Sequence, residues 1–157
     1  MSTKFRVIIA GSRSFDNYRA LTNGVTNIID ELLEEQGLVH ADAEIEIVSG
    51  CARGADQLGE KFAREHGYEL IRFPADWNQY GKKAGYIRNT EMAKYATSDD
   101  TKGVLIAFWD GQSKGTKHMI DIALRYGMKV YVGVGGKEWD NVIEYRNMLI
   151  DEGILEG

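Results

Sequence analysis

Short apolar runs rich in β-branched residues alternate with segments of helical periodicity along most of this chain. The strand-like runs are residues 5–10, 45–48, 70–73, 104–109 and 130–132. Three helix-like segments end at Gly37, Gly67 and Gly127, and another spans residues 83–96. Strands that alternate with helices over short connections predict a parallel sheet covered on both faces. We therefore expect an α/β fold, a Rossmann-like three-layer domain with a mainly parallel sheet of about five strands.

The alternation stops at Gly135-Gly136, which divides the 157 residues unequally. Residues 1–134 are expected to form the Rossmann-like domain. Residues 135–157 are expected to form a C-terminal helical extension, with Trp139, Val142, Ile143 and Leu149 on one face. This helix would pack on the same domain or on a partner subunit.

The composition is that of a soluble globular protein, with 43% apolar and 27% charged residues. No apolar run is long enough to cross a bilayer, and the N-terminal residues lack a signal-peptide layout, so we expect a cytoplasmic protein. A single cysteine, Cys51, excludes an internal disulfide and gives no metal-ligand cluster. We expect neither a metal nor a cofactor.

Four loops at the carboxyl edge of the predicted sheet each carry glycine and a cation. Ligands of open parallel sheets bind at this edge. The candidate ligand-binding residues there are Gly11, Ser12, Arg13, Ser14, Ser49, Gly50, Arg53, Gly54, Trp77, Tyr80, Arg88, Asp110, Ser113, Lys114, Gly115 and Thr116. With Lys82, Lys83 and Lys117, this edge holds seven of the 19 basic residues, although the net charge is −5. This arrangement suits a small anion, whereas a nucleic-acid surface is usually basic overall.

The chemistry of these loops points to phosphate. Glycine lets the backbone approach a ligand closely, and helix N-termini offer unpaired N–H groups to an anion. Arginine adds a bidentate fork. The sequence from Gly11 to Ser14 lacks the three spaced glycines of a dinucleotide fingerprint, and the Gly-Lys pairs do not fit a Walker A loop. The prediction therefore depends on four loops together.

Several residues have two interpretations. Trp77 and Tyr80 would either stack on a base or hold their loop in place, and Asp110 would either bind a ribose or shape its turn. Asp56 is interpreted as a first-turn residue that complements the helix dipole. His118 is expected to face solvent, and Cys51 to be a packed residue rather than a nucleophile.

Four stretches, "IIAGSRSF", "VSGCARGAD", "FPADWNQYGKKAGYIRN" and "AFWDGQSKGTKHMID", together resemble the YspA group of the SLOG superfamily, which is related to YpsA. The resemblance covers about residues 5–132. It implies a Rossmann-like fold and a nucleotide-derived ligand. The second stretch also resembles the phosphate-binding loop of the DNA-processing DprA proteins, which implies that Ser49, Gly50, Arg53 and Gly54 surround a phosphate.

A comparison with the LOG-type phosphoribohydrolases of the same superfamily bears on enzyme activity. Their Gly-Gly-x-Gly-Thr-x-x-Glu motif ends in a catalytic carboxylate. Gly115-Thr116 resembles the Gly-Thr pair, but Met119 falls at the glutamate position and cannot transfer a proton. Arg88 resembles an arginine of those enzymes. We therefore favour a binding protein over an enzyme and assign no catalytic residue; Asp110 or Glu91 would have to substitute.

The sequence thus supports three hypotheses. The first is a sensor or sequestering protein that binds a nucleotide or nucleotide-derived small molecule through glycine-rich phosphate loops. The second is a nucleotide-processing hydrolase resembling an N-glycosidase. The third is a DprA-like single-stranded nucleic acid binder, against which the acidic net charge argues. A homodimer is expected, with no membrane and no nucleic acid as partner.

Overall fold

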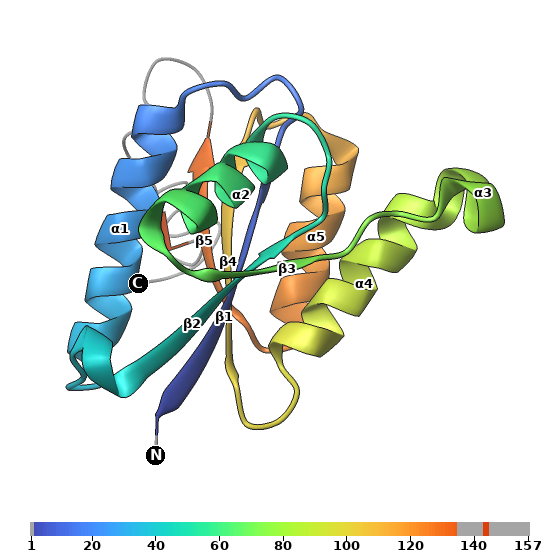
Figure 1. The fold of residues 1–157 in the computed structure, drawn as a ribbon. Helices are drawn as coiled ribbons and strands as arrows, with labels where there is room; N and C mark the ends of the chain where they lie inside the picture. The colour runs from blue at the N-terminus through green and yellow to red at the C-terminus, as the bar shows by residue number, and fades with distance from the viewer. Residues whose placement is uncertain (1, 135–142, 145–157) are drawn as a thin grey trace, which may run out of the picture.

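The computed structural model describes residues 2–134 and 143–144 and contains one six-stranded sheet with the order β3-β2-β1-β4-β5-β6 (Figure 1). The elements in chain order are β1 (Thr3–Gly11), α1 (Tyr18–Glu35), η1 (His40–Asp42), β2 (Ala43–Ser49), α2 (Ala55–His66), β3 (Glu69–Arg72), α3 (Trp77–Tyr80), η2 (Gly81–Lys83), α4 (Ala84–Ala96), β4 (Lys102–Trp109), α5 (Lys114–Arg125), β5 (Lys129–Val134) and β6 (Ile143–Glu144). Strands β1 to β5 are parallel, which confirms the predicted Rossmann-like α/β fold.

The two faces of the sheet bury separate apolar clusters. Val7 and Ile9 of β1 point into a cluster covered by α1 and α2, whereas Ile8 and Ala10 point into one covered by α4 and α5. Successive side chains of a strand face opposite sides, so a continuous apolar run serves both layers. Figure 1 shows α1 and α2 on one side of the sheet and α4 and α5 on the other.

The ends of the helices follow the capping residues in the sequence. Asn17 precedes α1, and its side chain accepts a hydrogen bond from the amide of Ala20 at 3.0 Å. Gly67 ends α2 in the left-handed conformation, at φ +73°. None of the helices in the described part of the chain is both long and apolar enough to span a membrane.

The predicted C-terminal helix is wrong at Ile143 and Glu144. These two residues form β6, which pairs antiparallel with Tyr131 and Val132 of β5. The open edge of β5 offers unpaired backbone groups, which β6 satisfies. The rest of the predicted extension, including Trp139, Val142 and Leu149, lies outside the described residues.

Candidate functional site

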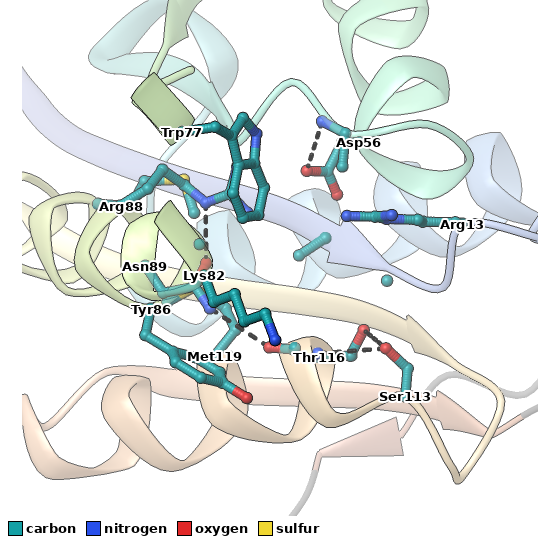
Figure 2. A pocket seen from close by; sticks show the side chains of 16 residues that line it. Arg13, Asp56, Trp77, Lys82, Tyr86, Arg88, Asn89, Ser113, Thr116 and Met119 are labelled. Carbon is teal, nitrogen blue, oxygen red and sulfur yellow. Dashed lines mark hydrogen bonds between the residues drawn. The ribbon is translucent and has the colours of Figure 1, made fainter. Parts of the chain in front are cut away.

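A cleft opens at the carboxyl ends of β1 and β4, where the chain leaves neighbouring strands toward opposite faces of the sheet. α1 follows β1 on one face, and α5 follows β4 on the other. This is the switch point at which open α/β sheets bind ligands. The cleft has a volume of about 210 Å³. It is lined by Ala10, Gly11, Arg13, Ala52, Asp56, Trp77, Lys82, Gly85, Tyr86, Arg88, Asn89, Met92, Ser113, Gly115, Thr116 and Met119 (Figure 2).

Three cations line the cleft, each from a different segment. Arg13 comes from the loop after β1, Lys82 from η2 and Arg88 from α4. Arg88 is held in place, because its Nη1 donates to the carbonyl of Gly50 and its Nε donates to Oδ1 of Asn89 at 3.0 Å. Burial lowers the pKa of Arg88, although the charge of Asp56 acts in the opposite direction. Arg13 and Lys82 are exposed, so their charged groups are free to approach a ligand.

The N-terminus of α5 forms part of the cleft wall. Ser113 caps this helix, and its Oγ accepts hydrogen bonds from the amide and the hydroxyl of Thr116 at 3.5 and 3.2 Å. Asp110 shapes the preceding turn, since its Oδ1 accepts from the amides of Gln112 and Ser113 at 2.8 and 2.7 Å. These bonds lower the pKa of Asp110. Of its two interpretations, the contacts match the turn-shaping one.

In the loop after β2, only Ala52 lines the cleft. Ser49 is buried; its Oγ donates to Glu60 at 2.7 Å and accepts from the amide of Cys51 at 3.0 Å. Arg53 is exposed and lies outside the cleft lining. Gly54 packs against the backbone of the loop after β1.

Six more of the predicted residues, including Asp110, fall outside the lining. Ser12 is buried and joins two loops, because its Oγ accepts from the amide of Asp110 at 2.9 Å. Ser14 and Lys114 are exposed. Gly50 is buried, and a Cβ there would lie 2.8 Å from Arg88 Nη1 and 2.9 Å from Asp56 Oδ2. Tyr80 is exposed on α3.

Two aromatic side chains frame the cleft. Trp77 of α3 lines it while remaining 51% exposed, so part of its side chain is available for contact. Tyr86 of α4 lies below Trp77 in Figure 2, and its ring centroid is 4.5 Å from that of His118. His118 is half-buried rather than solvent-facing, and burial lowers its pKa.

Asn89 is a cleft residue that was missed from the sequence. Its buried amide nitrogen lies 3.3 Å from the carbonyl oxygen of Gly115, to which it donates, and 3.1 Å from Nδ1 of His118. Asn89 thereby connects Arg88 to the first turn of α5. The sequence signal for Asn89 was its position directly after Arg88, which was predicted to bind the ligand.

Asp56 was also missed as a site residue, and it changes the chemistry of the cleft. It is 5% exposed and lines the cleft in the first turn of α2. Burial raises its pKa to about 6, although a hydrogen bond from the amide of Ala52 and the charge of Arg88 act in the opposite direction. Met119, at the position where LOG-type enzymes carry glutamate, also lines the cleft. Glu91 is exposed and outside this lining.

We predict that Asp56→Asn raises the free energy of unfolding at pH 8 by about 2–3 kcal/mol. The pKa of Asp56 is raised to about 6 in the folded protein, against about 3.9 for an unfolded aspartate. The folded state therefore binds the proton more tightly, so the stability falls as the pH rises from about 4, near the unfolded pKa, to about 6, the folded pKa, and the full loss remains above that pH. Urea unfolding at about pH 4 and pH 8 measures this. An equal difference at both pH values would contradict the prediction.

Comparison with known proteins agrees with the resemblance found in the sequence. The profile of the "YspA, cpYpsA-related SLOG family" matches residues 5–80. The Gene 61 protein of Mycobacterium phage D29 is 37% identical to the chain over 132 residues, which cover 80% of this chain and 93% of the phage protein. No solved structure matches the chain significantly.

Proposed function

The chain belongs to the YspA, cpYpsA-related SLOG family, and from this premise we propose that it binds a nucleotide or nucleotide-derived ligand in the cleft between the ends of β1 and β4. The observation that carries the proposal is the convergence of three cations on one cleft of an acidic protein. Arg13 comes from the loop after β1, and Lys82 and Arg88 come from the adjoining elements η2 and α4, much later in the chain. A site with this charge attracts an anion.

The phosphate position in this proposal lies at the N-terminus of α5. The amides of the first turn of a helix lack intrahelical partners and carry a partial positive charge, which favours a phosphate. Gly115 has no heavy atom within 4 Å of the position its Cβ would occupy, so a ligand has room to approach the backbone there. Lys82 is exposed, points toward this turn in Figure 2 and supplies a positive charge.

The aromatic residues suit the remainder of a nucleotide. The cleft volume of about 210 Å³ is below the range of about 300–1,000 Å³ typical of sites that enclose a whole small molecule. In our proposal the sugar and phosphate lie inside, and the base lies at the mouth against Trp77. Base–aromatic stacking contributes about 1–3 kcal/mol per base, and every base offers a π-face. Trp77 therefore adds affinity without selecting one base.

Arg13→Ala is expected to abolish binding of the ligand that stabilises the wild type. A ligand present at 100 times its dissociation constant stabilises a protein by about 2.7 kcal/mol, which raises the melting temperature by about 5–10 °C in a domain of this size. A thermal-shift screen with mononucleotides, dinucleotides, cyclic nucleotides and ADP-ribose measures this. Arg19→Ala is the matched control, because Arg19 is exposed on α1 and outside the cleft lining.

The same screen separates the cleft from the glycine-rich loop after β2. Binding lost in Arg53→Ala and kept in Arg13→Ala would place the ligand outside the cleft and overturn the proposal. Binding of single-stranded DNA with a steep dependence on salt would favour the nucleic-acid alternative. Recovery of the bound nucleotide after incubation distinguishes binding from hydrolysis, and we expect it intact.

A further inference from the structure

Asp56 is buried at the wall of a cleft whose other charged lining residues are cationic. Its carboxyl group is held between the loop after β2 and the cleft, and its Oδ2 accepts a hydrogen bond from the amide of Ala52 at 3.2 Å. This is the one hydrogen bond the Asp56 side chain makes within the described residues. Figure 2 shows its carboxyl on the same side of the cleft as the Arg13 guanidinium. The charge of Arg13 also acts on Asp56, so an anion bound between the two side chains would act on both.

Charged groups from three segments act on Asp56. Glu60, one turn along the same helix, disfavours its ionised form, whereas Arg88 from α4 and Arg13 from the loop after β1 favour it. Burial is stronger than either cation, so the pKa of Asp56 is raised to about 6. The free cleft thus holds a carboxylate that accepts a proton just below neutral pH.

A bound anion adds a second negative charge beside this carboxyl. Like charges in one site favour the neutral acid, and a neutral carboxylic acid has one O–H to donate to an anion oxygen. We propose that Asp56 binds the anionic group of the ligand as a neutral acid, so that the cleft takes up one proton together with its ligand. This inference rests on the proposed function and names a further binding residue in the same cleft.

If Asp56 instead bound the ligand as an ionised carboxylate, the affinity would depend on pH in the opposite direction. A carboxylate in a dinucleotide site accepts hydrogen bonds from ribose hydroxyls, and in that role it binds best when ionised. Affinity would then rise with pH, whereas a neutral Asp56 requires affinity to fall. The sign of the pH dependence therefore decides between the two.

The experiment is isothermal titration calorimetry with ADP-ribose and AMP between about pH 5.5 and 8. ADP-ribose is the sharper probe, because its bridging pyrophosphate does not titrate in this range. For the wild type we expect the dissociation constant to rise about tenfold per pH unit above about pH 6. Repetition in two buffers of different ionisation enthalpy should show uptake of close to one proton per ligand near pH 7.

Two variants isolate the contribution of Asp56. Asp56→Asn keeps the shape of the neutral acid and should bind ADP-ribose with an affinity independent of pH. Asp42→Asn, an exposed residue of η1 outside the cleft lining, should keep the wild-type pH dependence. Equal pH dependence in wild type and Asp56→Asn, or affinity that rises with pH, would overturn this inference alone. If the wild type bound neither these probes nor any other nucleotide of the thermal-shift screen at any pH, the proposed function would fail and this inference with it.

Discussion

Replacing Glu46 by alanine is expected to lower the free energy of unfolding by about 3–5 kcal/mol. Glu46 and Arg6 are both 5% exposed, and the Arg6 Nε donates to Oε1 of Glu46 at 3.1 Å. The Tyr95 hydroxyl also donates to Glu46, and Lys4 Nζ lies 3.0 Å from it. Removal of the carboxylate leaves the Arg6 guanidinium buried without its counter-charge, which costs far more than loss of a surface pair.

Glu44→Ala on the same strand is the matched control. Glu44 is exposed and lies 3.9 Å from Lys4, so its loss should change the unfolding free energy by less than about 1 kcal/mol. Denaturant unfolding of both variants measures the difference. A double variant, Arg6→Met with Glu46→Leu, should recover much of the lost stability because no unpaired charge remains. If Glu46→Ala lowered the free energy of unfolding no more than Glu44→Ala, the contacts of Glu46 with Arg6, Tyr95 and Lys4 would contribute nothing measurable to stability.

The Glu46 effect should also depend on pH. Burial raises the pKa of Glu46, but the hydrogen bonds from Tyr95 and Lys4 and the charge of Arg6 outweigh burial and hold it below its usual value. A lowered pKa stabilises the folded protein above the pKa of unfolded glutamate, about 4.3, and this stability is lost as the pH falls through the folded value. The difference in the free energy of unfolding between the wild type and Glu46→Ala should therefore become smaller below about pH 4.

The five parallel strands were predictable because each element carries its own local pattern. Buried strands such as β4 read as continuous apolar runs, and glycines such as Gly67 mark helix ends. A short segment that pairs with the edge of a sheet, such as β6, carries no such local pattern. The apolar spacing around Ile143 fits a helix, yet Ile143 and Glu144 pair with β5, since an open sheet edge elsewhere in the chain determines their conformation.

The location of the site could be predicted from the sequence, but only some of its residues could. Loop positions after β1 and β4 follow from topology alone, and Gly11, Arg13, Ser113, Gly115 and Thr116 line the cleft. The role of Asp56 depends on contacts between segments: it is buried because the loop after β2 folds over it and α4 brings Arg88 close.

Gly54→Ala is expected to lower the free energy of unfolding by about 3–5 kcal/mol. Gly54 lies at φ +79° and ψ −125°, a conformation that residues with a Cβ rarely adopt. A Cβ there would lie 2.3 Å from the carbonyl oxygen of Ser12 and 2.6 Å from that of Arg13. Both contacts are to backbone, so rotation of a side chain cannot relieve them. The loops after β1 and β2 would have to separate.

Gly37→Ala is the control for a glycine with positive φ and no close contact. Gly37 lies at φ +65°, and nothing lies within 4 Å of its Cβ position, so its replacement measures backbone strain alone, about 1 kcal/mol. Thermal or urea unfolding should show a much larger loss of unfolding free energy for Gly54→Ala than for Gly37→Ala. Equal losses would show that the contact between the two loops is unimportant. The loop after β1 also carries Arg13 into the cleft. A Gly54→Ala protein that still folds should therefore bind its ligand more weakly than Gly37→Ala, because the packed glycine sets the position of the arginine.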